Sequence, residues 1–357
     1  MLNFTVGPVQ MSEEILRMGA EQIPYFRTAE FSALMLENEN IMLRLFDAPT
    51  DSRCVFLTGS GTAAMEASVA CTLTHGDRAL IVDGGSFGRR FVELCDAHGI
   101  PHDEILLSPG EPLRAEHLES YAGNGYTAFL VNIHETSTGV LYDARLIADF
   151  CRREGLFLIV DAISAFIADP ISMRDMGADV LFTGSQKALA LPPGLSIAAL
   201  SPRAQERARA AKRRLFYLDF AEHLKNMERG QTPFTPAVDV LLRLNARLRS
   251  IDEKGITAER ANIVALAEDF RSKMGEFGFS PLTESPSNAV TAIRVREGAS
   301  AVRIFESLKD EYGIFVCPNG GALAESVFRV GHLGALTLDN NAALVAALRD
   351  IKERGLL

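Results

Sequence analysis

Three polar segments of this chain each follow an apolar run and carry side chains that could act together at one site. The first is Gly59-Ser60-Gly61-Thr62. Its glycines would let the backbone approach an anion, which hydroxyls and free N–H groups at a helix start would bind. The second is Asp161, because a carboxylate that ends a buried strand is costly unless it pairs with a cation such as a protonated ring nitrogen. Ordinary helix capping is the structural alternative for both segments.

The third segment, Ser185-Gln186-Lys187, contains the only lysine among the first 211 residues of a sequence that uses arginine freely. Burial in its apolar, proline-bounded surroundings would lower the pKa of this lysine, and a neutral amine can attack an aldehyde carbon. A lysine that reaches solvent from a loop is the alternative. An anion cradle, a carboxylate about 100 residues later and a lysine 26 positions beyond it follow the order needed to hold the phosphate, ring nitrogen and aldehyde of pyridoxal phosphate (PLP).

The elements that must position these residues alternate between strands and helices. Short apolar runs predict buried parallel strands: Cys54–Leu57, Ala79–Val82, Ala128–Val131, Phe157–Val160 and Val180–Phe182. Amphipathic helices are predicted between them, for example at 62–73 and 143–153, and glycines are expected to end helices at Gly76, Gly99, Gly155 and Gly177. This pattern predicts an α/β fold with a mostly parallel central sheet covered by helices, and ligands at the carboxyl ends of its strands.

The pattern changes after residue 236. Two long helices are predicted at 237–254 and 257–277, followed by strands at 290–295, 314–317 and 327–330. We therefore predict an N-terminal arm (1–20), a large domain (21–255) and a smaller C-terminal α+β domain (256–357).

The composition narrows the class of protein. With 357 residues, 47% hydrophobic and 23% charged, the chain is neither disordered nor fibrous. A net charge of −10 argues against a nucleic-acid partner, and the basic run at 207–214 is expected to be a solvated helix face. The chain has no apolar stretch of about 20 residues, no basic leader and no zinc-like cysteine spacing. We expect a cytoplasmic protein without membrane contact, disulfides or a bound metal.

The three polar segments resemble the class V aminotransferases of PLP fold type I, and the resemblance covers nearly the whole chain. That group includes alanine–glyoxylate, serine–glyoxylate and 2-aminoethylphosphonate–pyruvate transaminases. The stretch Ser185-Gln186-Lys187-Ala188-Leu189, with Pro192-Pro193-Gly194, is similar to the family's lysine motif. The resemblance implies that Lys187 holds PLP as a Schiff base and moves the proton between Cα and C4′. It also implies that Gln186 contacts the phosphate and that Asp161 pairs with the pyridine nitrogen.

Further cofactor contacts are implied by the same resemblance. Residues Ser60, Gly61 and Thr62 match the phosphate-binding turn. Phe87 takes the place of the aromatic residue that stacks on the cofactor ring, although a core-facing aromatic is the alternative. Thr136, in the run 135–139, matches the contact to the ring hydroxyl. Thr235 resembles a threonine that reaches the phosphate of the partner subunit, which implies a homodimer with shared active sites. Thr232 departs from the pattern, because some relatives carry a tyrosine there.

Substrate contacts are implied at three other positions. Arg329 matches the arginine that grips the substrate carboxylate, for which a planar guanidinium is well suited. A surface arginine on a strand edge is the alternative. Gly7 resembles the arm that lines the substrate pocket, and Arg27 resembles an early arginine motif that could belong to a second cationic subsite. The implied reaction is a ping-pong transamination from a small donor (alanine, serine or 2-aminoethylphosphonate) to pyruvate or glyoxylate.

Two other functions remain open on the same fold. A lyase or cysteine desulfurase is one, and a desulfurase needs a nucleophilic cysteine in the C-terminal half. Cys317 is the only candidate, and its place at the end of an apolar strand predicts packing rather than reactivity. A non-catalytic PLP-binding protein is the other, but such a protein could dispense with the lysine that this chain retains. No G-x-G-x-x-G follows the first strand, which argues against a dinucleotide-dependent oxidoreductase.

Overall fold

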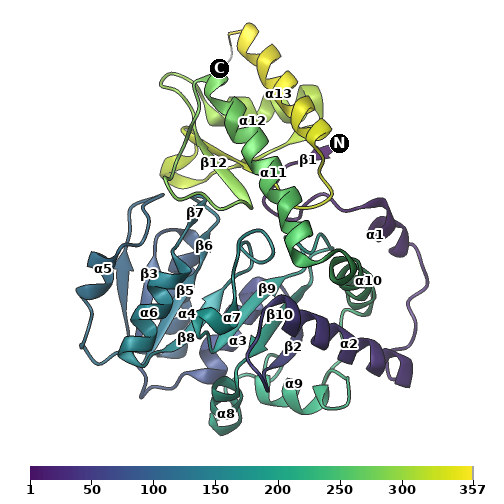
Figure 1. Ribbon diagram of the computed structural model, residues 1–357, viewed down its shortest axis with the longest axis vertical. Helices are drawn as coiled ribbons and strands as arrows, with labels where there is room; N and C mark the ends of the chain where they lie inside the picture. Colours follow the sequence, from purple (N-terminus) through teal and green to yellow (C-terminus); the bar gives the residue numbers. More distant parts are fainter. Residues whose placement is uncertain (356–357) are drawn as a thin grey trace.

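Seven strands between residues 53 and 200 form one sheet in the lower part of Figure 1, within the computed structural model, which describes residues 1–355. In spatial order the strands are β2 (Arg53–Thr58), β10 (Leu195–Leu200), β9 (Val180–Gly184), β8 (Phe157–Asp161), β5 (Ala128–Asn132), β3 (Ala79–Asp83) and β4 (His102–Leu106). Neighbours from β9 to β4 pair in parallel, whereas β10 is antiparallel to both β9 and β2. The predicted α/β fold with a mostly parallel sheet is confirmed.

All five predicted strands are present, but one of them is paired differently. The run Cys54–Leu57 belongs to β2, which pairs only with the antiparallel β10. The sequence pattern also misses two strands. The edge strand β4 carries the polar, half-exposed run His102-Asp103-Glu104, so it lacks the continuous apolar stretch of a buried strand. Strand β10 is buried throughout, but Ser196, Ala198 and Ala199 weaken its β-propensity.

Helices cover both faces of this sheet (Figure 1). One face carries α3 (Gly61–Thr72), α4 (Ser86–His98), α8 (Pro202–Ala210) and α9 (Phe220–Met227). The other carries α2 (Ala29–Leu45), α6 (Ala144–Glu154), α7 (Met173–Met176) and α10 (Val238–Lys254). The smaller elements are α1 (Glu13–Met18), α5 (Ala115–Glu119) and the hairpin of β6 (His134–Glu135) with β7 (Val140–Leu141). No helix in the described part is long and apolar enough to cross a membrane.

Three of the four predicted glycine caps are left-handed, with φ of 63°, 70° and 63°: Gly99, Gly155 and Gly177. The prediction for Gly76 is wrong, because α3 already ends at Thr72 and the next residue is extended. The turn that contains Gly76 is closed instead by Asp77, whose carboxylate accepts hydrogen bonds from the N–H and hydroxyl groups of Thr74. Side-chain hydrogen bonds therefore close this turn, where the sequence pattern predicts a left-handed glycine.

Residues beyond 255 add helices and a second, antiparallel sheet. Its order is β11 (Ser280–Pro281), β12 (Val290–Arg294), β15 (Val327–Gly331) and β14 (Cys317–Pro318). The helical elements are α11 (Ile256–Met274), η1 (Gly275–Phe277), α12 (Ala301–Tyr312), η2 (Gly321–Leu323) and α13 (Leu338–Glu353). These elements enclose their own apolar core.

The predicted strand at 314–317 is split between two sheets. Ile314–Phe315 forms β13 and pairs in parallel with β1 (Leu2–Asn3), whereas Cys317–Pro318 pairs with β15. The N-terminus therefore lies beside the C-terminal elements, with Phe4 buried in their core (Figure 1). Helix α11 contributes to this core and to the main one. The division into 1–20, 21–255 and 256–357 stays a prediction, and residues 356–357 lie outside the described part.

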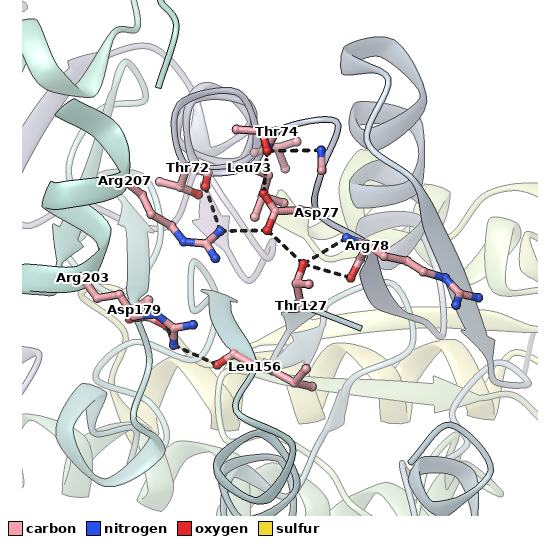
Figure 2. Close-up of polar contacts among 12 residues, drawn as sticks. Thr72, Leu73, Thr74, Asp77, Arg78, Thr127, Leu156, Asp179, Arg203 and Arg207 are labelled. Atoms are coloured by element: carbon pink, nitrogen blue, oxygen red, sulfur yellow. Dashed lines mark hydrogen bonds and ion pairs between the residues drawn. The ribbon is translucent and has the colours of Figure 1, made fainter. Parts of the chain in front are cut away.

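A network of polar side chains closes the amino ends of the parallel strands (Figure 2). Asp77, just before β3, accepts hydrogen bonds from Thr127 Oγ1 at 2.9 Å and from Arg207 Nη1 at 3.1 Å. Asp179, just before β9, lies 3.4 Å from Nη1 of Arg203. Both arginines belong to α8, so the network ties this helix to the edge of the sheet.

The basic run at 207–214 is therefore not the solvated helix face that the sequence predicts. Besides Arg207, Arg214 donates hydrogen bonds to the backbone carbonyls of Ala70 and Leu73 at the end of α3, and of His98 at the end of α4. The last carbonyls of a helix lack partners within it, and a guanidinium has five N–H donors to offer. Two of the five cations in this run thus hold helices in place.

Candidate active site

The carboxyl ends of the parallel strands surround a cavity of about 310 Å³. Nine of the twelve residues predicted from the sequence line it: Gly7, Ser60, Gly61, Thr62, Phe87, Thr136, Asp161, Gln186 and Lys187. They come from the N-terminal arm, the end of β8, the first turns of α3 and α4, and loops that follow the strands. A larger cavity of about 440 Å³ beside α10 contains none of them. The chemistry of the lining, not its size, marks the smaller cavity as the candidate site.

The turn at the start of α3 is shaped for an anion. Ser60 is the N-cap residue, but its side chain accepts no hydrogen bond from the helix, which argues against the capping alternative. A Cβ on Gly61 would lie 2.0 Å from Cδ1 of Ile163, so a larger residue would displace that side chain from the cavity lining. The Thr62 hydroxyl accepts a hydrogen bond from Arg90 Nη1 at 3.2 Å. Helix N–H groups, hydroxyls and a guanidinium thus meet at one end of the cavity, a combination that suits a phosphate.

Asp161 is the last residue of β8 and is only 5% exposed. Its Oδ1 atom accepts a hydrogen bond from the N–H of Ile163 at 2.8 Å, which is a local turn and not a helix cap. Burial raises the pKa of the Asp161 carboxyl to about 7, despite that hydrogen bond. A cationic group in the cavity would stabilise the charged form of this carboxyl.

Lys187 lies buried beneath the N-terminal arm. Its Nζ atom donates a hydrogen bond to the carbonyl oxygen of Val6 at 2.5 Å. A Cβ on Gly7 would lie 2.8 Å from Cδ of Lys187, and Gly7 has a φ of 138°, so the arm requires a glycine where it crosses the lysine. Burial lowers the pKa of Lys187 to about 8. The alternative of a lysine that reaches solvent is therefore wrong.

Several buried polar atoms at this edge have no hydrogen-bond partner within the described part of the chain. They are Oε1 of Gln186, both ring nitrogens of His134 and Nε of Arg329. Burial, followed by the positive charge of Lys187, lowers the pKa of His134 to about 3, so its imidazole is neutral and can both donate and accept. Because buried polar groups are nearly always paired in folded proteins, these atoms point to a ligand.

The residues of this cavity fit PLP. The turn at 60–62 would hold the phosphate, Asp161 the ring nitrogen and Lys187 the aldehyde carbon. Phe87 is half-buried and belongs to none of the three apolar cores, so a place against the cofactor ring suits it better than the core-facing alternative. The unpaired atoms of Gln186 and His134 lie in the same cavity.

Thr136 and Arg329 are joined at one side of the cavity. The Thr136 hydroxyl shares a hydrogen bond of 2.7 Å with the hydroxyl of Ser164, and the Thr136 carbonyl accepts one from Arg329 Nη1 at 3.1 Å. Arg329 does not line the cavity itself; its Nη2 atom donates to the Pro318 carbonyl at 2.8 Å. It is half-buried on β15, the central partner of β12 and β14, and not on a sheet edge as the surface alternative requires.

Two predicted residues lie away from the cavity. Arg27 donates hydrogen bonds to the side chain of Gln231 and to the carbonyls of Thr232 and Pro233, at 3.1, 2.8 and 3.3 Å. It thereby fixes the segment that leads to Thr235, whose side chain is exposed. The geometry of one chain does not bring either residue to the cavity.

Four further residues line the cavity and were not assigned a role from the sequence: Arg90, His134, Ile163 and Ser164. Arg90 stands one helical turn after Phe87, and its guanidinium carbon lies 4.9 Å from the centre of that ring. This spacing was available in the sequence. The other three follow directly from strand ends, next to residues that the sequence did mark, so proximity along the chain was the missed signal.

Cys317 lies on the paired strand β14, opposite Arg329 in register. It is half-buried and packs against the main apolar core, as the sequence predicts, and it is not on a loop. All five cysteines are free. Within residues 1–355, no group of three or more His, Cys, Asp or Glu side chains is close enough together to hold a metal ion.

Comparison with known proteins gives near full-length matches. The model of the family described as aminotransferase class-V matches residues 24–334. A Synechococcus protein named soluble hydrogenase, small subunit, is 31% identical over 97% of this chain and 91% of its own length. The L-aspartate–glyoxylate aminotransferase of Paracoccus denitrificans is 29% identical over 94% of this chain and 86% of its own. An aspartate aminotransferase structure from Thermus thermophilus, 29% identical, superposes over 100% of both chains with a TM-score of 0.92.

Proposed function

This chain belongs to the class-V aminotransferases and is a PLP-dependent transaminase, and we propose on that premise that it transfers an amino group from a small donor to pyruvate or glyoxylate. The proposed reaction is ping-pong, so the donor leaves as a 2-oxo acid before the acceptor binds. The observation that carries the proposal is the buried Nζ atom of Lys187, which shares one cavity with Asp161 and the anion-binding turn at 60–62.

Lys187 has two tasks in this proposal. Bound PLP would supply an electron sink that makes the Cα–H bond of an amino donor acidic. The Nζ atom of Lys187 would hold the aldehyde carbon between turnovers and would carry the Cα proton while a substrate is bound. A pKa of about 8 suits this exchange, because Nζ can then gain and lose a proton near neutral pH. Val6 and Gly7 lie directly over Nζ and limit the access of water.

Asp161 is proposed to keep the ring nitrogen protonated. It has no ion-pair partner among the cavity side chains of residues 1–355, and burial disfavours its charge, as does the negative charge of Glu135. A protonated ring nitrogen would supply that missing partner, and the carboxylate would in turn retain the proton on the ring. Gln186, with Oε1 unpaired, stands next in sequence to Lys187 and completes the lining.

Arg329 is proposed to bind the α-carboxylate of each substrate. Its Nε atom is buried and unpaired, and its other nitrogens donate only to backbone carbonyls. A carboxylate is a stronger acceptor than either carbonyl and can bind a guanidinium through two oxygens. Because Arg27 is held by the segment 231–233, the structure gives no support to a second cationic subsite there.

The names of the relatives favour glyoxylate as the acceptor. Proteins named for aspartate–glyoxylate and serine–glyoxylate transfer are both 29% identical to this chain. The donor is proposed to be small, such as alanine or serine, because a donor with a second anionic group would need another cation.

A panel of amino donors tests this function. Alanine, serine, aspartate and 2-aminoethylphosphonate are each added to the PLP-loaded protein, and the visible absorbance of lysine-bound PLP is followed. We expect alanine or serine to abolish it at modest concentration and glyoxylate or pyruvate to restore it. Absence of any such cycle with all four donors would contradict the proposal. Because one relative is named as a hydrogenase subunit, hydrogen-dependent dye reduction is the counter-assay, and it should not exceed that of Lys187→Met.

A homodimer with shared active sites is also proposed. Next to the exposed Thr235, Phe234 stacks on Tyr217 with ring centroids 5.3 Å apart, and both Phe216 and Tyr217 are exposed. A second copy of the chain would cover such an aromatic surface. Mixing Lys187→Met with a Thr235 variant of low activity should restore activity only if sites are shared, because one mixed site then combines both wild-type residues. The free, mostly buried cysteines support a cytoplasmic location.

The desulfurase alternative is tested at Cys317. Because its side chain packs on a paired strand, Cys317→Ser should keep transaminase activity within about threefold. A variant that lost all activity would favour the alternative, since only a desulfurase requires this thiol.

A further inference from the structure

Helix α4, which carries Phe87 into the cavity, begins without a capping side chain of its own. Its N-cap residue is Gly85, which can accept no hydrogen bond from the first turn through a side chain. The N–H groups of Phe87 and Gly88 are at the second and third helical positions, where an N-cap oxygen normally binds. Both donate instead to Oε2 of Glu135, at 3.0 and 3.1 Å. The cap of α4 thus comes from β6, 47 or more residues along the chain.

The same carboxylate also holds the loop on its own side of the cavity. Its Oε2 atom accepts a third hydrogen bond from Nδ2 of Asn132 at 2.8 Å, and Oε1 accepts two from the N–H and hydroxyl groups of Ser137. Glu135 is completely buried. Five donors and a helix N-terminus compensate for the burial of its charge.

Gly85, which faces Glu135 at the start of α4, has no side chain and so leaves room for the carboxylate. A Cβ on Gly85 would lie 2.6 Å from Cδ of Glu135 and 2.5 Å from Oγ of Ser137. No other residue would leave room for the carboxylate to reach Phe87 N and Gly88 N. Gly85 cannot cap α4 through a side chain, and its lack of a Cβ is what allows Glu135 to cap the helix instead.

We propose that Glu135 is a positioning residue of the transaminase site: it fixes the ring of Phe87 and the hydroxyl of Thr136 relative to each other across the cavity. Phe87 receives its backbone anchor directly from Oε2, and Thr136 stands between Glu135 and Ser137, whose N–H is anchored by Oε1. The inference rests on the proposed function, because these two residues are the ones assigned to the cofactor ring.

The charge of Glu135 has a second effect on the site. It lies close enough to Asp161 to raise the pKa of that carboxyl, after burial itself. A negative charge near the site favours the protonated form of every group around it. Its removal should therefore lower the pH at which the absorbance of lysine-bound PLP changes.

Three variants separate positioning from charge. Glu135→Asp keeps the charge but is one methylene too short to reach both sides. Glu135→Gln keeps the length, removes the charge and can accept with only one of its two terminal atoms. Glu93→Gln is the matched control, because it removes an exposed carboxylate from the same helix and leaves the cap of α4 intact. Each is loaded with PLP, and visible circular dichroism, PLP dissociation, kcat, KM and the pH dependence of absorbance are measured.

We expect both Glu135 variants to lose most of the visible circular dichroism of bound PLP, which reports the fixed placement of the ring. PLP should dissociate about tenfold more readily, and kcat should fall about 10- to 100-fold with donor KM changed less than threefold. Only Glu135→Gln should shift the absorbance pH profile, by about half a unit to one unit downward. Glu93→Gln should resemble the wild type in every measurement.

Wild-type circular dichroism and PLP dissociation in Glu135→Asp, or in Glu135→Gln, would overturn the inference. If Glu135→Gln does not accumulate as folded protein, Glu135→Asp decides the matter on the same measurements. Failure of the wild type to bind PLP would instead contradict the proposed function and is recognised before any variant is compared.

Discussion

Two groups of buried side chains, one at each edge of the central sheet, differ in their hydrogen bonding. At the amino edge the carboxylates of Asp77 and Asp179 are each held by several donors, including arginines of α8 (Figure 2). At the carboxyl edge, buried atoms of His134, Gln186 and Arg329 have no partner. A satisfied network contributes to stability, whereas unpaired buried groups cost stability unless a ligand binds them. The difference separates the edge that stabilises the fold from the edge at which we propose that the cofactor binds.

Two buried aspartates make the comparison concrete. Asp179 accepts hydrogen bonds from Leu158 N–H and from the Ser201 hydroxyl, at 3.1 and 3.0 Å, and pairs with Arg203. Asp161 accepts one, from Ile163. Burial raises the pKa of both carboxyl groups, and the pKa of Asp161 reaches about 7. We expect substitutions at the two positions to have opposite consequences.

The largest effect is expected at Lys187. In Lys187→Met, the amine that holds PLP is removed while the apolar stem is kept, so kcat/KM should fall at least about 10⁴-fold. The PLP-free variant should be at least as heat-stable as the wild type at pH 7, since the folded pKa is lowered to about 8 and the buried amine is costly below that pH. Lys212→Met, at an exposed lysine, is the control for both measurements. Activity within tenfold of the wild type would refute the role of Lys187.

Asp161→Asn should lower kcat/KM by about 10²- to 10³-fold, because an amide cannot keep the ring nitrogen protonated. Its effect on the PLP-free protein should be stabilising. The folded pKa of about 7 exceeds the unfolded value, so the stability that Asp161 contributes is fully present at low pH and is lost as pH rises from about 4 through 7.

Thermal melts of PLP-free protein check this sign. Asp161→Asn should unfold at a higher temperature than the wild type at pH 8, and the difference should shrink at pH 4. A variant that is less stable than the wild type at pH 8 would show that Asp161 is satisfied within the chain, as Asp179 is.

Arg329→Lys should act on substrate binding. The point charge is kept but the planar fork is lost, so the KM for both donor and acceptor should rise about 10- to 100-fold with a smaller change in kcat. Steady-state kinetics with each substrate varied in turn measures this. An unchanged KM would place the carboxylate elsewhere.

Asp179→Asn should have the smallest effect on catalysis. It weakens the pairing with the half-exposed Arg203 and should reduce the free energy of unfolding by about 1–2 kcal/mol, measured by denaturant titration of the holoenzyme. The kcat/KM per folded molecule should stay within about twofold of the wild type. A large catalytic loss at this position would erase the distinction between the two edges.

Sequence alone marked most of the residues that line the proposed cofactor cavity, but few of those in the network at the amino edge. Lys187 and Asp161 stand out because a lone lysine and a strand-end carboxylate need a local reason to exist. The roles of Arg207, Arg214 and Glu135 could not be predicted in the same way, because their partners lie far along the chain. At Gly76 the local pattern was misleading. A glycine stands where a helix end is expected, but α3 ends earlier and the side chain of Asp77 closes the turn.

Covalent trapping is the most direct test of the assignment of Lys187. The PLP-loaded protein is reduced with borohydride and digested, and the labelled peptide is identified by mass spectrometry. We predict one PLP per chain, on the peptide that contains Lys187, and no stoichiometric label in Lys187→Met. Label on the exposed Lys212 or Lys225, with Lys187 unmodified, would contradict the account.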